Sequence, residues 1–348
     1  MAYTAIDKPS DYFDIKLYTG NNRIAQTITG LDFQPDFTWI KCRTAGENHA
    51  LTDAVRGVNS QLVTNNTNAQ TTLTTIITAF TSDGYSLGVA DTVNNNGGTY
   101  VSWNWKANGA GATNEAGSIN TIKTSVSTTS GFSISQWVGT GSNATIGHGL
   151  GVTPKCFIVK KTSGVSAWSV YHEDVGNTKF LNLNGTGAAT TGPTVWNNTS
   201  PTSSVFSVGT GDNGNASGAT YIGYFFAEKQ GYSKFGSYTG NGNANAPFIY
   251  TGFKPNFIML KNASTAQDWQ MYTWDMQPYN EFCTTSAGRL KANTADAQST
   301  KTAFDMLSNG FKMRTDAEDI NASGNEIIYM AFAEEPLITS TGIPTPAR

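Results

Sequence analysis

The chain has 348 residues, a charged fraction of 14% and a net charge of -3, whereas globular proteins usually carry roughly 25% charged residues. No run of Lys and Arg occurs, which argues against a nucleic-acid binder, because that function needs a basic face to neutralise phosphates. No apolar run approaches the roughly 20 residues that cross a bilayer, and the start MAYTAIDKPSDYFDIK lacks the apolar region of a Sec signal peptide, so we expect synthesis in a cytoplasm and no membrane insertion.

The polar surface must therefore consist mainly of Asn, Thr, Ser, Gln and Gly, residues that suit strands and tight turns. With 38% hydrophobic and 11% aromatic residues, the chain has enough apolar material for a packed core and is not expected to be disordered. Composition alone therefore predicts a soluble all-β protein.

Along the chain, one pattern occurs three times: an aromatic residue, a proline 17 positions later and a lysine six positions after the proline. The members are Tyr18, Pro35 and Lys41, then Trp137, Pro154 and Lys160, then Tyr238, Pro255 and Lys261. The prolines lie 119 and 101 residues apart, far more than the roughly 20 to 50 residues of solenoid repeats. We interpret the copies as three related, domain-sized β units in tandem.

Each unit repeats further strand patterns. The apolar runs FTWIK, CFIVK and FIMLK predict strands buried on both faces, with the final lysine marking the exit to solvent. The stretches YVSWNWKA, YIGYFFAE and IIYMAFAE predict closing strands. An Asn and a Gly precede each closing strand and predict hairpin turns at Asn94/Gly97, Asn215/Gly218 and Asn321/Gly324. Short helices are candidates at TTLTTIITAF (71–80) and TAFDMLS (302–308), with strand or loop as the alternative.

These patterns predict tandem β-sandwich or jelly-roll-like units of about seven or eight short strands. The predicted boundaries are a first unit at 1–108, a linker at 109–130, a second unit at 131–230, a third unit at 231–336 and a tail at 337–348. The linker, rich in Gly, Ser and Thr, is either flexible or an extended strand packed along a neighbour. Units two and three lack a linker and should dock rigidly. The tail, with its prolines, should be extended or ordered only against another chain.

Candidate catalytic and metal sites are weak. The histidines (His49, His148, His172) and cysteines (Cys42, Cys156, Cys283) lack zinc-site spacing, and we expect reduced thiols, no cofactor and no enzyme activity. His49 takes the position of Trp168 and Trp269 in the other units, which predicts packing plus a hydrogen bond. Divalent-cation binding at TGDNGNASG (210–218), or at the cluster of Asp316, Glu318 and Asp319, is a minority interpretation beside a turn and a solvated loop.

Tryptophans among polar turns are the candidates for contact with a ligand, because an aromatic ring can stack on a sugar face while Asn and Asp bind its hydroxyls. The candidates are Trp196, Trp168, Trp269 and Trp274. Trp196, in TVWNNTSP, is favoured because it has no counterpart in the first unit. Packing in the core or against another subunit is the alternative.

Taken together, the stretches YTGN, ITGLDFQPDFTWIK, VGTGSNATIGHGLGVTPKCFIVK, GYSKFGSYTGN and IYMAFAE resemble a repeat domain of bacteriophage structural proteins, especially those of marine phages. The resemblance spans about Ala5 to Pro336 and implies a virion protein, but it supplies no catalytic residue, cofactor or ligand.

The function expected from this resemblance is a tail-associated fibre or adhesin that contacts a host-surface glycan or protein. Its partners would be other virion proteins, and it would act as a homo-oligomer, with a trimer as one option. A capsid or neck decoration protein is the alternative, and a glycan depolymerase ranks third.

Overall fold

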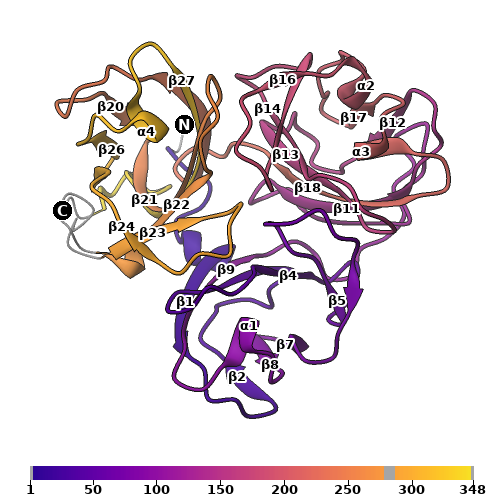
Figure 1. Ribbon diagram of the computed structural model, residues 1–348, viewed down its shortest axis with the longest axis horizontal. Coiled ribbons are helices and arrows are strands. Elements are labelled where there is room, and N and C mark those ends of the chain that lie inside the picture. Colours follow the sequence, from indigo (N-terminus) through magenta and orange to yellow (C-terminus); the bar gives the residue numbers. More distant parts are fainter. Residues whose placement is uncertain (1–2, 278–286, 346–348) are drawn as a thin grey trace.

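The computed structural model describes residues 3–277 and 287–345 and confirms an all-β fold. Strands make up 41% of the chain and helices 7%, and the sheets are antiparallel. The described residues form three lobes that meet at a common centre (Figure 1). In the view of Figure 1, lobe 1 lies at the bottom, lobe 2 at the upper right and lobe 3 at the upper left.

Lobe 1 has a main sheet in the order β1-β9-β3-β4 and a smaller sheet in the order β2-β8-β7. Its elements are η1 (Pro9–Asp11), β1 (Phe13–Thr19), β2 (Gln26–Ile28), β3 (Phe37–Cys42), β4 (Ala50–Asp53), β5 (Ser60–Gln61), β6 (Thr71–Thr72), β7 (Ile77–Thr81), β8 (Gly84–Leu87), α1 (Asp91–Asn94) and β9 (Thr99–Trp105). Strands β5 and β6 pair with each other and bound a segment, residues 60–72, that we call arm 1.

Lobe 2 has a main sheet in the order β10-β11-β18-β13-β14-β15-β16 and a smaller sheet of β12 and β17. Its elements are β10 (Lys123–Ser127), β11 (Phe132–Val138), β12 (Ala144–Gly147), β13 (Cys156–Lys161), β14 (Ser169–His172), β15 (Lys179–Asn182), β16 (Thr190–Thr191), α2 (Pro193–Trp196), β17 (Val205–Val208), α3 (Asp212–Asn215) and β18 (Thr220–Phe226). Residues 179–191, from β15 to β16, form arm 2.

Lobe 3 has a main sheet in the order β19-β27-β21-β22-β23-β24 and a smaller sheet in the order β20-β26-β25. Its elements are β19 (Ser233–Thr239), β20 (Phe248–Tyr250), β21 (Phe253–Asn262), β22 (Gln270–Thr273), η2 (Trp274–Met276), β23 (Ala287–Lys291), β24 (Ser299–Thr300), β25 (Phe304–Leu307), β26 (Gly310–Met313), α4 (Glu318–Asn321) and β27 (Glu326–Pro336). Residues 287–300, from β23 to β24, form arm 3.

A shared strand order relates the main sheets of the described lobes. The order β1-β9-β3-β4 matches β11-β18-β13-β14 and β19-β27-β21-β22. The registers match as well: Trp105, Phe226 and Phe332 each pair with the first residue of the strand that starts the matching order, namely β1, β11 and β19. That the lobes are copies of one repeated unit stays a prediction from the sequence.

The central strands of each main sheet are buried on both faces, which explains their continuous apolar runs. Alternate residues of β9 (Val101, Trp103 and Trp105) enter one central cluster that contains residues from all described lobes. Tyr100, which points the other way, packs in a peripheral cluster between the main and smaller sheets of lobe 1. Lobes 2 and 3 have their own peripheral clusters. The lobes therefore share one core and do not each have only a core of their own.

Several local predictions need correction or completion. The lysines that end the central strands are buried, not at an exit to solvent: Lys41, Lys160 and Lys261 are each 0% exposed. Both helix candidates are strands or loop, with β6 and β7 in the first and β25 in the second. Of the predicted linker, residues 123–127 form β10, which pairs with β11, so the extended-strand alternative is right for that part.

The Asn and Gly pairs do not form hairpin turns, because α1, α3 and α4 connect a smaller sheet to a main sheet. The glycines do adopt positive φ, as at Gly97 with φ of 78°. The asparagines instead end the helical turns with buried side chains that bind backbone groups of a neighbouring loop. Asn94, for example, accepts from the Asn21 amide at 2.9 Å and donates to the Gly88 carbonyl at 2.7 Å.

The C-terminal tail is ordered against its own chain as far as residue 345. Both the amide and the hydroxyl of Ser340 donate to the Asp7 carboxylate, each at 2.5 Å. The tail therefore lies beside the N-terminal segment, residues 3–6, and not only against another chain as one interpretation of its sequence had it.

Candidate functional site

The predicted surface tryptophans are buried, so the prediction that they contact a ligand is wrong. Trp168 is 0% exposed, Trp196 1%, Trp269 3% and Trp274 7%. Trp196 ends α2 and packs its ring edge-on against Phe157 at 4.9 Å between centroids. The polar sequence around each tryptophan gave no sign of this, because the covering groups come from distant parts of the chain.

Trp168 and Trp269 instead lie where an arm of one lobe meets the next lobe. The indole of Trp168 donates to the Val63 carbonyl of arm 1 at 2.9 Å, and the indole of Trp269 donates to the Asn182 carbonyl of arm 2 at 2.9 Å. His49, at the equivalent position of lobe 1, hydrogen-bonds through Nε2 to the Lys291 carbonyl of arm 3 at 2.9 Å. The predicted packing and hydrogen bond of His49 are thus confirmed.

The buried lysines mark the same seams between lobes. Besides carbonyls of its own lobe, each ammonium donates to a carbonyl of a neighbouring arm: Lys160 to Thr67 at 3.1 Å, Lys261 to Thr186 at 2.9 Å and Lys41 to Ala295 at 3.0 Å. Burial lowers the pKa of each lysine to about 8. Arm 1 thus holds lobe 2, arm 2 holds lobe 3 and arm 3 holds lobe 1, which closes a ring within one chain.

A buried ion pair adds to the seam between lobes 1 and 2. Arg56 Nε donates to Asp53 Oδ2 at 2.6 Å, and the hydroxyl of Tyr224 from lobe 2 donates to the same oxygen at 2.8 Å. Burial opposes the charge of Arg56, but the adjacent Asp53 and Tyr224 raise the guanidinium pKa. Removal of either partner would leave the other charge buried and unpaired, which is strongly destabilising.

The histidines are held neutral. Burial lowers the pKa of His49 to about 3 and that of His148 to about 4, and it also lowers the pKa of His172. At His49 the geometry fixes the tautomer, because Trp39 Nε1 donates to Nδ1 at 2.8 Å and leaves the proton on Nε2 for Lys291. These buried rings belong to the framework of the fold.

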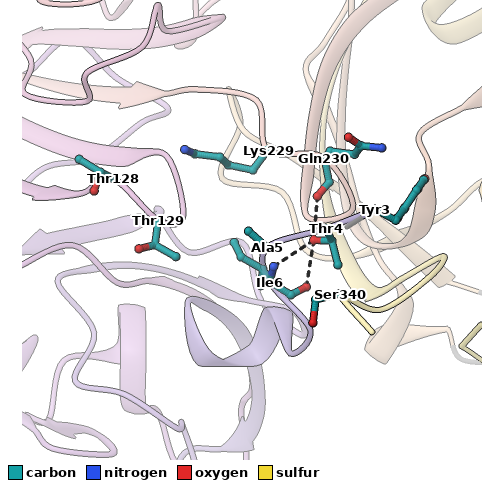
Figure 2. A pocket seen from close by; sticks show the side chains of 9 residues that line it. All are labelled: Tyr3, Thr4, Ala5, Ile6, Thr128, Thr129, Lys229, Gln230 and Ser340. Carbon is teal, nitrogen blue, oxygen red and sulfur yellow. Dashed lines mark hydrogen bonds between the residues drawn. The ribbon is translucent and has the colours of Figure 1, made fainter. Parts of the chain in front are cut away.

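One accessible candidate site is an open concavity of about 680 Å³ beside the N-terminal segment (Figure 2). We call it the terminal concavity. Its lining comes from the N-terminal segment, the turn between β10 and β11, the connection between lobes 2 and 3, and the C-terminal tail: Tyr3, Thr4, Ala5, Ile6, Thr128, Thr129, Lys229, Gln230 and Ser340. The lining surface is mostly apolar, with hydroxyl, amide and ammonium groups among it, and the hydroxyls of Thr4 and Ser340 already donate to Gln230 and Asp7.

The N-terminal segment is held in place by side-chain contacts on both sides of the concavity. The Thr4 hydroxyl donates to the Gln230 carbonyl at 2.9 Å, and the Tyr3 hydroxyl donates to the Gly252 carbonyl at 2.7 Å. The Tyr3 hydroxyl also lies 3.2 Å from that of Tyr250, which is 52% exposed. A second concavity of about 240 Å³ lies on this side and shares Tyr3 and Gln230 with the first.

Sequence reasoning missed this site, although one signal was present. By strand register, Lys229 occupies the position of Asn108 in lobe 1 and Glu335 in lobe 3. A cation that replaces an amide and an acid at matched positions marks lobe 2 as different. The remaining lining comes from both ends of the chain, whose proximity no local pattern reveals.

The structure gives less support to the other candidate sites. Within residues 3–277 and 287–345, no group of His, Cys, Asp and Glu has the arrangement of a metal site. Asp319 of the acidic cluster pairs with Lys301 and accepts from Gln270 at 2.9 Å. Cys42 and Cys156 are buried free thiols, and Cys283 lies outside the described residues. Among the described helices, none is long and apolar enough to cross a bilayer.

Comparison with known proteins gives a family but no activity. The model of a family described as a domain of unknown function (DUF7483) matches residues 8–336, nearly the whole chain. No curated protein matches the chain significantly.

Proposed function

The chain belongs to the DUF7483 family, and from this premise we propose that it is a non-enzymatic structural protein of a bacteriophage virion. We place it in the tail, as a fibre-associated protein or adhesin that contacts the host surface. The resemblance of its repeated stretches to phage structural domains motivates the virion assignment. Its partners in this proposal are other virion proteins and a glycan or protein of the host envelope.

The observation that supports a contact function is the terminal concavity on an interlocked framework. Segments that lie outside the strand order common to the described lobes line this concavity. Loops and termini that vary on a fixed scaffold are where proteins place recognition sites. The seams, by contrast, use buried tryptophan, histidine and lysine side chains to hold the lobes together.

Presentation by a homo-oligomer fits this role. A single open concavity offers a ligand few simultaneous contacts, so its affinity should be low. Several copies on one particle raise the effective concentration of the site and convert weak contacts into stable attachment. The proposal therefore requires several copies on each tail.

Gold-labelled antibody against this protein on intact particles, viewed by electron microscopy, tests the proposal. Label at the tail tip or fibres is the expected result. Label spread over the head would replace the tail proposal with a capsid decoration protein. Absence of label from particles whose lysate contains the protein would overturn the virion assignment itself.

A further inference from the structure

We propose that the terminal concavity binds an anionic sugar, whose carboxylate or phosphate group pairs with the ammonium of Lys229. This inference rests on the proposed host contact and specifies its chemistry. Three observations carry it: an ammonium without a counter-charge, a lining that includes hydroxyl groups and an aromatic ring, and the lack of a matching cation and of a matching β10 turn in the described parts of lobes 1 and 3.

The first observation concerns the charge of Lys229. The side chain is half-buried, and burial lowers its pKa. No described carboxylate forms an ion pair with it, although most half-buried lysines of this chain have such a partner, as Lys155 has in Glu173 at 2.5 Å. In Figure 2 the side chain extends from the connection between lobes 2 and 3 toward Thr128 and Thr129. A partly desolvated cation gains when an anion approaches it, because the weaker solvent screening strengthens their attraction.

The second observation concerns the rest of the lining. Thr128 and Thr129 are exposed at the turn that follows β10, and Ser340 and Gln230 lie across the concavity. Their hydroxyl and amide groups can exchange hydrogen bonds with sugar hydroxyls. The ring of Tyr3 adds an apolar surface of the kind on which the C–H face of a sugar packs. A compact inorganic anion would use only Lys229, whereas a sugar can also contact the neighbouring hydroxyl groups of Thr128 and Thr129.

Neighbouring carboxylates are already engaged and limit where the anionic group can sit. Asp7 accepts both bonds from Ser340, and Glu228 accepts from Lys234 Nζ at 2.9 Å. The negative charge of Asp7 makes the Ser340 end unfavourable for an anion. The ligand's carboxylate or phosphate must therefore lie at the Lys229 end, with its hydroxyl groups toward Ser340.

The third observation is that, among the described residues, the cation and the turn between β10 and β11 have no match in lobes 1 and 3, while Tyr3 and Ser340 come from the two ends of the chain. Strand β10 has no counterpart in the sheets of lobes 1 and 3, and the positions equivalent to Lys229 are Asn108 and Glu335. A lysine that served only solubility would not need to line a concavity, as Lys229 does. A site built from lobe-specific parts is what a recognition function requires.

Titration calorimetry on the full chain tests the proposal with three probes: tetragalacturonate, mannose 6-phosphate and neutral maltotetraose. We expect at least one anionic probe to bind with Kd of ~1 mM, as for other shallow sites, and maltotetraose to bind more weakly. Lys229→Met should weaken the anionic probe about tenfold, the loss expected for one charge-assisted contact. Lys229→Arg should retain binding.

The matched control is Lys179→Met, which removes the same charge from an exposed position on β15 of the same lobe. It should bind like the unaltered protein. The galacturonate and phosphate arms show which anionic group the site prefers. The proposal is overturned if neither anionic probe binds, if maltotetraose binds equally well, or if Lys229→Met binds like Lys179→Met. Tail labelling without anionic-sugar binding would leave the proposed function standing and remove only this inference.

Discussion

At the residue scale, buried asparagines tie the lobes' loops to their helical turns. Asn94, Asn215 and Asn321 are each 0% exposed. Each accepts from one backbone amide and donates to a carbonyl six residues earlier: the acceptors are Gly88, Gly209 and Thr315. Only an amide side chain offers an acceptor and donors at this size, so aspartate cannot substitute for it.

We therefore expect Asn94→Asp to lower the free energy of unfolding by roughly 2–4 kcal/mol, because it buries a charge and leaves the Gly88 carbonyl without its donor. Urea denaturation followed by tryptophan fluorescence measures this. Asn96→Asp, two positions away at an exposed site, provides the control and should change stability little. Equal effects of the two substitutions would show that the buried network contributes nothing.

His49 gives a second prediction, on acid sensitivity. Its folded pKa of about 3 lies below the ordinary value of about 6.5, so between these values the unfolded chain binds more protons. Stability is therefore lost as pH falls through this window. Protonation of Nδ1 would also place an N–H group opposite the Trp39 Nε1–H donor and break the hydrogen bond between them. His49→Gln should lose less stability than the unaltered protein between pH 7 and pH 5, measured as urea midpoints.

Burial also lowers the pKa values of His148 and His172, so they too make the protein less stable in acid. The test is therefore the difference in acid dependence between His49→Gln and the unaltered protein, not the total loss of stability in either one. An identical acid dependence in His49→Gln and the unaltered chain would contradict a neutral, buried His49. The charges that face His49 include Lys41 from β3, which further lowers its pKa. Asp296 lies on the same arm as Lys291 and pairs with the Lys291 ammonium at 3.4 Å.

At the element scale, the arms explain what the sequence allowed us to predict and what it did not. Strand patterns such as FTWIK predicted the central strands, because both faces of each are filled with apolar side chains. The place of His49 among Trp168 and Trp269 also predicted its packing. The burial of Lys41 and Trp168 could not be predicted, since an arm from another lobe covers each of them. Periodicity describes one strand and carries no information about a segment more than a hundred residues away.

Each buried lysine should make a contribution to stability that grows at alkaline pH. The folded pKa of Lys160, about 8, lies below the ordinary value of about 10.4, so the unfolded chain binds more protons between them. The contribution of Lys160 to stability therefore increases as pH rises from 8 to 10. Cys156 and the buried tyrosines, whose pKa values burial raises, contribute in the opposite direction, so the comparison with the variant is what tests Lys160. Thermal midpoints of Lys160→Met should rise less, or fall more, across this range than those of the unaltered protein. Lys179→Met, at an exposed position, should follow the unaltered protein. A matching slope in Lys160→Met would contradict the burial of its charge.

At the scale of the whole molecule, the lobes share one core and close a ring. The central cluster joins residues such as Trp105, Phe132 and Phe332 from lobes 1, 2 and 3. Their rings pack together: the ring centroid of Trp105 lies 6.3 Å from that of Phe132 and 5.7 Å from that of Phe332. Removal of any lobe would expose the inner faces of the other two. Loss of one lobe should therefore unfold the rest.

Differential scanning calorimetry of the full chain tests this interlocked ring most directly, because a shared core and closed seams should make the lobes unfold together. We predict one transition with equal calorimetric and van't Hoff enthalpies. At roughly 0.7 kcal/mol per residue near 60 °C, the enthalpy of the whole chain should be about 240 kcal/mol. Two or three separable transitions, or a calorimetric enthalpy about three times the van't Hoff value, would show that the lobes unfold independently and would contradict the shared core.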